Sequence, residues 1–491
     1  MDFPVFHLDW LGNRLLIAAI AVLHVLINHA MAVGAIPLVV AMEWLGFRSG
    51  EPRWDRHARR ILGVCFVITT SLGALTGVGI WLSASLVNPA AIAGLIRVFF
   101  WAWFVEWIIF VLEVCFILAY YLTWPVWTGP RKRRHLAMGV ALAVFSWLTM
   151  AIITAILGFM MDSGVWPERR NLLSGVLNPL YLPQLLFRTP AAMVMAGLFA
   201  MFLTPFLLAR RDPFRPRVVR FCGAWTLAWT GPLMAGAWAY WQAVPEALLA
   251  TLPVALATQA LENRVASVGY ALLALAAVLP LVAAWGTIAP RSLPRPVLVL
   301  PFAAVVALVG TFERVREFIR KPDVIAGYMY ANGIRRHDYP LLAEQGLLRQ
   351  ATYAAARDPA ADPLAAGREV FVLACTRCHT TSGVNGITAK LAGLYGSRPW
   401  SPQAVAGFID GMHHVRPFMP PFPGRPAERD ALAAWLVNLQ TAPERLPGAQ
   451  RIGPLMPPPT SRPSGAEPSP AAARQDPSAP DGPRPASPAT G

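Results

Sequence analysis

Long apolar runs alternate with short basic segments along the first three hundred residues of the chain. Runs of roughly twenty residues or more are long enough to cross a bilayer, and we predict eight membrane-spanning helices from them. These runs lie near 12–45, 61–88, 96–124, 136–161, 187–209, 219–243, 266–289 and 294–312. The pattern predicts an all-α, polytopic transmembrane helix bundle. Its first run lacks a cleavage site after a short apolar region, so we expect it to remain as an uncleaved anchor.

Basic residues concentrate after every second apolar run. The clusters are Arg48 to Arg60, Arg131 to Arg134, Arg210 to Arg220, and Arg291 with Arg295. Lys and Arg near helix ends are retained on the cytoplasmic side, so these loops are predicted to face the cytoplasm. With an even number of helices, the N-terminus and everything after the last helix should then lie on the other side. In a bacterial inner membrane, that side is the periplasm.

The composition agrees with a membrane protein. Hydrophobic residues make up 55% of the 491 residues and charged residues 14%, which lies outside the range of ordinary soluble domains. The formal net charge of +15 does not indicate a nucleic-acid partner, because the basic residues lie between apolar runs rather than on one face. Cys65, Cys115 and Cys222 fall inside apolar runs and are predicted to be small buried hydrophobes.

The chain divides into four parts. Residues 1–312 form the predicted transmembrane domain, and residues 313–364 form a charged connector. Residues 365–440 form a compact segment of its own. Residues 441–491 are rich in Pro, Ala and Ser and lack the apolar content for a core, so they are predicted to be disordered.

The compact segment contains the sequence "CTRCH" at Cys375, Cys378 and His379. Cys-x-x-Cys-His is the attachment signature of a c-type haem, in which two thioethers hold the porphyrin and the His is an axial iron ligand. A redox disulfide or half of a zinc site would use the same Cys pair, but the chain has no second pair and the following His favours haem.

A low-spin c haem takes a second axial ligand, commonly a Met thioether. Met419 in the Pro-rich stretch "RPFMPPFPG" is the predicted ligand, and His413 and His414 are its competitors. The segment resembles a small class I cytochrome c domain. That resemblance implies attachment of the haem outside the cytoplasm, in agreement with the predicted topology.

Ionisable groups at membrane depth are costly, so those in the apolar runs point to function. The first run holds His24 and His29, which are five positions apart and point in different directions on a helix. The third holds Glu106 and Glu113, which are seven apart and share a face. His29 could ligate a second haem or copper, since imidazole suits both, or it could hydrogen-bond within the bundle.

The first run, "VLHVLINHAMAVGAIPLVVAMEWL", resembles the first helix of cytochrome bd oxidase subunit I. A second similar stretch, "REFIRKPDVIAGYM", follows the last run, and "NPAAIAGL" is a weaker third match. The resemblance covers roughly residues 1–330. It implies that His24 ligates the haem of the oxygen site and that Glu317 ligates a high-spin haem at the outer face. Arg320 and Lys321, with Lys where the family has Gln, would then hold haem propionates or form a solvated surface.

The chain departs from this family at three places. Arg188 or Thr189 and Ala266 stand where the ligands of the low-spin b haem are expected, although Arg264 remains, so that haem is predicted to be absent. Only about twenty residues replace the long quinol-binding loop. The family's acidic residues of the third helix align with Ala93 and Trp101, which makes Glu106 and Glu113 displaced substitutes or new features.

Together these features predict a bd-like terminal oxidase subunit that lacks quinol input. Electrons would come from a periplasmic cytochrome c or another donor through the covalent haem c. One or two high-spin haems of b or d type near His24 and Glu317 would reduce oxygen to water, with Glu106 and Glu113 relaying protons. Membrane lipid and a second membrane subunit are further expected partners. The alternatives are a reductase of nitric oxide or another small oxidant, and a non-catalytic electron-transfer subunit of a respiratory complex.

Overall fold

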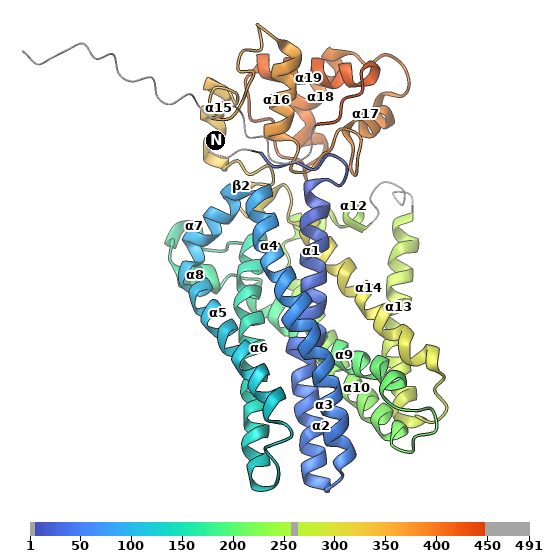
Figure 1. Ribbon diagram of the computed structural model, residues 1–491. Helices are drawn as coiled ribbons and strands as arrows, with labels where there is room; N and C mark the ends of the chain where they lie inside the picture. The colour runs from blue at the N-terminus through green and yellow to red at the C-terminus, as the bar shows by residue number, and fades with distance from the viewer. Residues whose placement is uncertain (1–4, 257–263, 447–491) are drawn as a thin grey trace, which may run out of the picture. The chain divides into compact units, whose positions relative to one another are not determined.

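The computed structural model describes residues 5–256 and 264–446, and it is almost wholly helical (Figure 1). The predicted disordered tail falls outside these residues from position 447 onward. The helices of the apolar part are α1 (Asn13–Ile27), η1 (Asn28–Gly34), α2 (Ala35–Ser49), α3 (Pro52–Ile68), η2 (Thr69–Gly73), α4 (Ala74–Val87), α5 (Pro89–Thr123), η3 (Gly129–Arg131), α6 (Lys132–Met161), α7 (Trp166–Arg169), α8 (Leu172–Val176), α9 (Tyr181–Leu207), α10 (Arg215–Ala243), α11 (Glu246–Leu249), α12 (Leu252–Leu256), α13 (Val265–Ile288) and α14 (Arg295–Ile319).

The remaining elements follow α14. They are β1 (Asp323–Ile325), β2 (Met329–Tyr330), η5 (Arg336–Asp338), α15 (Tyr339–Gln345), α16 (Pro363–Ala374), α17 (Ile387–Tyr395), α18 (Pro402–Val415) and α19 (Pro426–Thr441). The two strands pair antiparallel in a small hairpin directly after α14.

Each of the eight predicted spans is a long helix or a pair of helices joined without a break. In the part of the chain that the structure describes, seven of them are long and apolar enough to cross a membrane. The eighth, α10, is 29 residues long but is not among the seven. Its many Trp, Thr and Gly residues lower its apolarity, although it packs along α9 and α13 like its neighbours.

Two of the spans contain π-helical turns. Residues of η1 join α1 to α2, and residues of η2 join α3 to α4. A π-turn shifts the backbone hydrogen bonds by one residue and occurs frequently at functional sites. The two π-turns contact each other, so both lie at the same depth in the bundle.

Helix α9 lies at the centre of the bundle, where 78% of its apolar window is buried. Small residues allow its neighbours to approach closely. A Cβ atom at Gly197 would lie 2.2 Å from Thr226 Oγ1 of α10, and one at Gly236 would lie 2.2 Å from the Leu186 carbonyl oxygen. Close backbone contact at small residues is the usual way in which helices associate within a membrane.

Cys65 and Cys222 are buried, as predicted, but the prediction for Cys115 is wrong. Cys115 is exposed on α5, a peripheral helix of which only 6% of the apolar window is buried. An apolar run alone does not distinguish a side chain that faces the core from one that faces lipid, because both surroundings are apolar.

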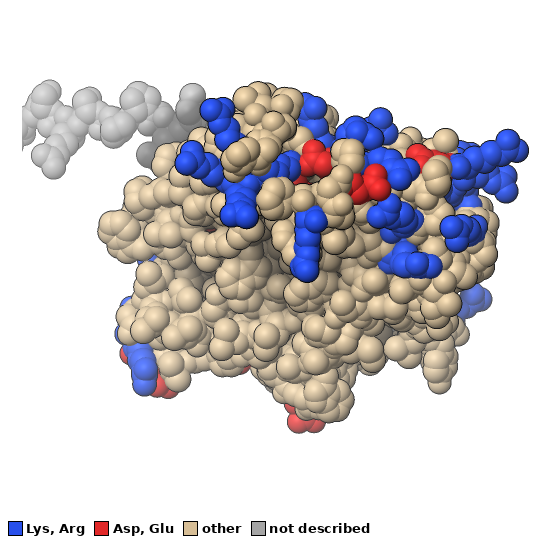
Figure 2. Space-filling model, turned by 90° about the horizontal axis from the view of Figure 1, so that it is seen from below, with Lys and Arg blue, Asp and Glu red and all other residues tan. Residues whose placement is uncertain are grey.

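Basic side chains gather on the face at which α2 joins α3, α5 joins α6 and α9 joins α10 (Figure 2). Few acidic side chains lie among them on this face. One that does is Glu51, whose carboxylate contacts Arg53 Nε at 2.8 Å and Arg217 Nη1 at 2.9 Å. These three loops, which the sequence predicts to face the same side of the membrane, therefore lie at one end of the bundle.

Helix α14 continues to Ile319, beyond the predicted boundary at residue 312. The prediction ended there because Glu313, Arg316 and Glu317 interrupt the apolar run. Each of these side chains finds a charged partner, so the helix does not need to end where its sequence becomes polar.

The C-terminal helices α16 to α19 form a core of their own. Phe371 of α16 and Trp435 of α19 have ring centroids 5.0 Å apart, and both side chains are buried. Gly367 lies at the crossing of the two helices, where a Cβ atom would be 2.0 Å from the Ala431 carbonyl oxygen. This crossing positions the turn that follows α16, which contains the CTRCH sequence.

Candidate haem sites

The CTRCH turn begins where α16 ends. Cys375 and Cys378 are half-buried free thiols rather than a disulfide. His379 Nδ1 lies 3.3 Å from the Asn385 carbonyl oxygen, and Asn385 Nδ2 donates to the Cys378 carbonyl oxygen at 2.7 Å. No described residue hydrogen-bonds to His379 Nε2. An imidazole held through one nitrogen leaves the other available to a metal, so the turn fits a covalently attached haem.

Burial lowers the pKa of His379 to about 4. The imidazole is therefore neutral at pH 7, which is the form that binds iron. Arg377, between the two cysteines, donates from Nη1 to the Leu373 carbonyl oxygen at 2.8 Å and so secures the turn to α16.

Met419 lies in the loop between α18 and α19, and its carbonyl oxygen is 2.5 Å from His413 Nδ1. His413 thus holds the loop that carries Met419, while His414 is exposed. This arrangement favours Met419 over both histidines as the second axial ligand. The assignment of the ligand remains a prediction.

The segment before α1 packs against the residues after CTRCH. The Asp9 carboxylate accepts hydrogen bonds from the Thr381 backbone N–H at 2.7 Å and from the Thr381 hydroxyl, and both residues are buried. Burial by itself raises the pKa of Asp9, but the hydrogen bonds from His7 and Thr381 outweigh it and lower the pKa below 3.8. We did not foresee this contact, because the two residues are 372 positions apart and neither is unusual in its local sequence.

His24 in α1 faces the helix pair η2 and α4. Its Nδ1 lies 3.1 Å from Thr76 Oγ1 and 3.2 Å from the carbonyl oxygen of Gly73, the last residue of η2. Gly77 gives the ring room, since a Cβ atom there would lie 3.2 Å from His24 Cε1. No described residue hydrogen-bonds to His24 Nε2. The ring is held in the same way as that of His379, so it fits a role as a haem ligand.

Glu317 lies in the last turn of α14, where its carboxylate contacts Arg320 Nη2 at 2.6 Å. Arg320 also donates to the Val324 carbonyl oxygen at 2.8 Å, so its guanidinium ties α14 to the hairpin. Lys321 points elsewhere, with its Nζ 3.7 Å from Cys378 Sγ. Burial lowers the pKa of Lys321 to about 8. The predicted role of holding haem propionates therefore stays a prediction for Arg320. Lys321 points toward the CTRCH turn instead.

The structure does not bring His24 and Glu317 together. The guanidinium of Arg14, near the start of α1, lies over the ring of Phe318, which follows Glu317. His24 is ten residues further along the helix, or about 15 Å at the rise of an α-helix. The two candidate ligands therefore suit two separate haems rather than the two faces of one.

His29 belongs to a buried ionic chain. Its Nδ1 lies 2.9 Å from the Val25 carbonyl oxygen and its Nε2 lies 3.2 Å from Arg188 Nη1. Arg188 Nη2 in turn contacts Glu313 Oε1 at 2.6 Å, and Glu313 Oε2 contacts Arg316 Nε at 3.1 Å. With both nitrogens of His29 engaged, the geometry favours its hydrogen-bonding alternative over haem or copper ligation.

Arg188 is one of the two residues predicted at the position of the low-spin haem ligand. The other, Thr189, accepts a hydrogen bond from Trp147 Nε1 at 3.0 Å. A guanidinium paired with a carboxylate does not bind iron. One turn earlier on α9, Gln184 is fully buried and neither of its amide atoms has a partner in the described part of the chain. An unpaired buried amide is costly, so this position suits a polar group of a bound cofactor.

Glu113 of α5 is held by α6. Its carboxylate accepts hydrogen bonds from Ser146 Oγ at 2.7 Å and Thr149 Oγ1 at 3.4 Å. Glu106 is half-buried and lies two turns away on the same helix. Arg264, also predicted to contact a cofactor, is exposed at the start of α13.

A second buried polar cluster lies near the basic face of Figure 2. Glu43, which is fully buried, is contacted by His135 Nδ1 at 2.5 Å, by Lys132 Nζ at 2.7 Å and by the Tyr120 hydroxyl. Lys132 also contacts Asp55 at 2.5 Å. The cluster joins α2, α3, α5 and α6. The sequence gives no sign of this cluster, because the partners of Glu43 lie in basic or apolar stretches of other helices.

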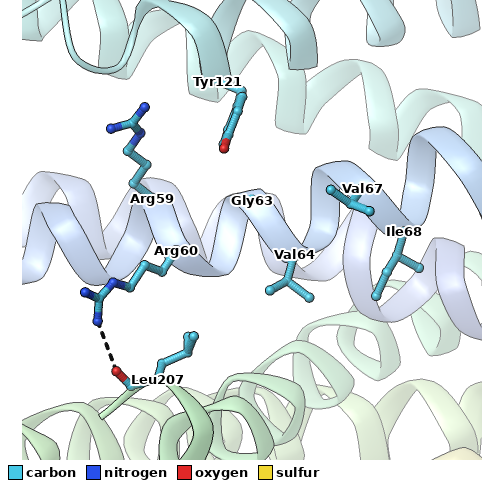
Figure 3. Close-up of a pocket in the computed structure, with 8 residues that line it drawn as sticks. All are labelled: Arg59, Arg60, Gly63, Val64, Val67, Ile68, Tyr121 and Leu207. Atoms are coloured by element: carbon cyan, nitrogen blue, oxygen red, sulfur yellow. Dashed lines mark hydrogen bonds between the residues drawn. The ribbon is translucent and has the colours of Figure 1, made fainter.

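An open groove of about 790 Å³ lies between α3, α5 and α9 (Figure 3). Its lining is apolar apart from Arg59, Arg60 and the hydroxyl of Tyr121, and Arg60 donates to the Leu207 carbonyl oxygen at 3.0 Å. The groove contains no His, Cys or carboxylate, so it is not a site for binding haem iron.

Two family models match this chain. Residues 13–243 match cytochrome bd terminal oxidase subunit I, and residues 362–436 match cytochrome c oxidase, cbb3-type, subunit III. The chain combines a membrane domain similar to cytochrome bd subunit I with a domain similar to a cytochrome c. These matches confirm the two resemblances found in the sequence.

The bd-like fold is also found by comparison with solved structures. The bd oxidase from Geobacillus thermodenitrificans superimposes with a TM-score of 0.55 at 17% sequence identity, over 70% of this chain and 95% of that one. At this identity the likeness shows the fold alone. No curated protein matches the chain. The cytochrome c domain implies haem c, the bd-like domain implies further haems, and together they support a terminal oxidase or an electron-transfer role.

Proposed function

We propose that this chain is the oxygen-reducing subunit of a respiratory terminal oxidase, fed by a periplasmic cytochrome c through its own haem c. When bound, the haems supply the irons that carry electrons and the iron at which oxygen is reduced. Four electrons and four protons convert one dioxygen molecule to two water molecules. The chain has to provide ligands for the haems, a path for protons and a place for the donor.

One observation carries the proposal. His379 in the cytochrome c domain and His24 in the bd-like domain are held in the same way, each through Nδ1 with a backbone carbonyl oxygen nearby. In both, Nε2 has no hydrogen-bond partner among residues 5–256 and 264–446. One chain therefore presents two oriented imidazoles, one in each domain, and this suits a donor haem and a haem that binds oxygen.

The assignment of a cytochrome c as the electron donor follows from the residue at the position of the low-spin haem ligand. Arg188 is committed to Glu313 and His29, so the position carries a buried ion pair. With a short segment in place of the quinol loop as well, the cytochrome c domain is the part of the chain suited to receive electrons. The donor is a soluble or membrane-bound cytochrome c.

Glu113 and Glu106 are the proposed proton carriers. Ser146 and Thr149 orient Glu113 between α5 and α6. Glu106 is seven residues away, or about 10 Å along the helix, so water or another side chain has to complete the connection. Carboxyl groups in apolar surroundings exchange protons near neutral pH, which suits this role.

The basic face of Figure 2 supports a cytoplasmic position for the loops α2–α3, α5–α6 and α9–α10. The contact between Asp9 and Thr381 places the segment before α1 at the same end as the cytochrome c domain. An even number of crossings, with α10 as the eighth, then gives a periplasmic cytochrome c domain in a bacterial inner membrane.

The test is a carbon monoxide difference spectrum of the reduced, purified protein, combined with oxygen uptake supported by reduced cytochrome c. We expect carbon monoxide to perturb a high-spin haem and the protein to consume oxygen. In the variant His24→Ala the carbon monoxide signal should be lost while the absorbance of haem c stays.

His29→Gln is the matched control, because both nitrogens of His29 are engaged and Gln can still accept a hydrogen bond from Arg188. It should keep the carbon monoxide signal. A wild-type spectrum that does not respond to carbon monoxide would mean a non-catalytic electron-transfer subunit. Consumption of nitric oxide without consumption of oxygen would show the other alternative to be correct.

A further inference from the structure

The end of α14 contacts both loops that carry the candidate ligands of haem c. Lys321 Nζ lies 3.7 Å from Cys378 Sγ, and Cys378 is followed by His379. The rings of Phe318 and Phe418 have centroids 5.5 Å apart, and Phe418 is followed by Met419. Lys321 and Phe318 are buried. The two loops that carry the candidate ligands of haem c therefore both contact one short segment of the membrane domain.

That segment begins beside the candidate ligand of a membrane haem. Glu317 directly precedes Phe318, and Lys321 lies four residues after Glu317, just beyond the end of α14 at Ile319. The position of Glu317 is fixed by its ion pair with Arg320, which also binds the hairpin after α14. The residues that contact the ligand loops of haem c thus lie within four positions of the candidate ligand of the next haem.

A second part of the chain holds the cytochrome c domain in this position. The segment before α1 binds the residues after His379 through Asp9 and Thr381, and the Val384 N–H donates to the Trp10 carbonyl oxygen at 3.3 Å. Gly383 makes this approach feasible, since a Cβ atom there would lie 2.1 Å from the Asp9 carbonyl oxygen. We call Asp9, Trp10, Thr381, Gly383 and Val384 the N-terminal clamp.

The clamp is short and leads directly into the membrane. Only Gly12 separates the segment up to Leu11 from the first residue of α1, Asn13, and Asn13 Nδ2 donates to the Phe6 carbonyl oxygen at 2.8 Å. Arg14, one residue later, lies over the ring of Phe318. The N-terminal clamp and the end of α14 therefore lie next to each other where the two domains meet.

We propose that Phe318 to Lys321 is the junction through which electrons pass from haem c to the bd-like domain, and that the N-terminal clamp keeps the cytochrome c domain docked on it throughout turnover. Lys321 is the positioning residue of this junction. The inference rests on the proposed function and names its internal route. In each transfer one electron leaves haem c, which is oxidised, and one haem of the bd-like domain is reduced.

The positive charge of Lys321 has a further consequence. Placed against the attachment site at Cys378, the ammonium group stabilises the electron on haem c, because a nearby cation favours the form of lower net positive charge. Replacement by Gln should lower the midpoint potential of haem c. This effect is measured at equilibrium and does not depend on turnover.

The first experiment compares the full-length variants Lys321→Gln and Phe318→Leu with the wild type. The reduced protein is mixed with oxygen, and the oxidation of haem c is followed by its absorbance. We expect haem c to be oxidised several-fold more slowly in both variants, with unchanged haem content. In Lys321→Gln the loss of positioning has to outweigh the larger driving force that the lower potential of haem c provides. Arg398→Gln removes one positive charge from an exposed position on the cytochrome c domain and should leave the rate unchanged.

The second experiment tests permanent docking. In the pair Asp9→Cys and Thr381→Cys, a disulfide would lock the clamp, and the same protein reduced and alkylated serves as its own control. A docked domain keeps the wild-type rate of haem c oxidation when it is locked. If the domain has to leave this position to deliver electrons, locking it should stop the oxidation of haem c.

The outcomes separate the two proposals. If oxygen does not oxidise haem c in the wild type, the proposed function is wrong. If oxidation occurs but Lys321→Gln and Phe318→Leu retain the wild-type rate, or if the locked clamp stops it, only the junction proposal is overturned.

Discussion

The haem c site and the membrane haem sites show two ways of building a cofactor site. In the first, two attachment cysteines and an iron ligand lie within five residues, and a single turn after α16 positions all three. In the second, His24 and Glu317 come from opposite ends of the domain's sequence and lie about 15 Å apart along the bundle. His379 of the first site is held by residues of its own turn, whereas His24 contacts η2 and α4 and Glu317 pairs with Arg320.

The difference predicts how the two sites respond to substitution. A site built from one turn keeps its geometry whenever that turn folds. A site built from several helices depends on each pairing between them, among them the buried chain from His29 to Arg316. The variants below probe this contrast, beginning with the largest expected effect.

Removal of both attachment thiols, Cys375→Ser with Cys378→Ser, should abolish covalent haem c and oxygen uptake with cytochrome c as donor. The haems of the bd-like domain should remain, because their ligands lie on other helices. A pyridine haemochrome assay counts the two kinds of haem. Full activity with cytochrome c in this variant would contradict the contrast drawn between the sites.

Arg188→Ala should destabilise the bd-like domain by about 3 to 5 kcal/mol, because it removes one of the two cations that pair with the buried Glu313 carboxylate. Replacing all three residues, Arg188→Met, Glu313→Met and Arg316→Met, should cost much less, since no member of this ion-pair chain is then left buried without a partner. Thermal unfolding in detergent micelles measures both. Equal losses of stability in the two variants would show that the broken ion pair does not cause the destabilisation by Arg188→Ala.

Met419→Leu should lower the midpoint potential of haem c by on the order of 0.1 V, a fraction of the roughly 0.8 V over which axial ligands set haem potentials. His413→Ala should shift it less, because His413 acts on the loop through the Met419 carbonyl oxygen. A spectropotentiometric titration compares the two. The larger shift in His413→Ala would make His413 the ligand.

Asp9→Asn should weaken the N-terminal clamp by about 1 to 3 kcal/mol, the range for hydrogen bonds to a charged group. The pKa of Asp9 is lowered in the folded protein, so this stabilisation is complete above pH 3.8 and disappears as the pH falls through the lower folded value. The difference between wild type and variant in thermal loss of the haem c signal should therefore be constant near pH 7 and shrink in acid.

Asp358→Asn is the control for this prediction. The exposed carboxylate of Asp358 accepts a hydrogen bond only from the Ala360 N–H, at 3.0 Å, in the described residues. It should leave the thermal transition unchanged at neutral pH. If Asp358→Asn lowers the thermal transition as much as Asp9→Asn does, the effect of Asp9→Asn is not specific to the N-terminal clamp.

Much of this molecule could be predicted from its sequence. Length and apolarity located all eight long helices, and the CTRCH motif located the haem c site, because each signal is contained in adjacent residues. The limits appeared where partners are remote. The apolar run does not show that Cys115 faces outward, and it does not show that Glu313 pairs with Arg188 of another helix and lets α14 continue beyond residue 312.

The amino-acid sequence by itself determined the membrane bundle, the CTRCH turn predicted to attach haem c and the basic end of the helices, since these follow from local apolarity, spacing and charge. Only the tertiary structure decided that both nitrogens of His29 are engaged, that Lys321 turns to Cys378, and that Asp9 binds Thr381. The physical reason is that hydrogen bonds and ion pairs act over a few ångströms, while their partners in this chain are separated by up to 372 positions.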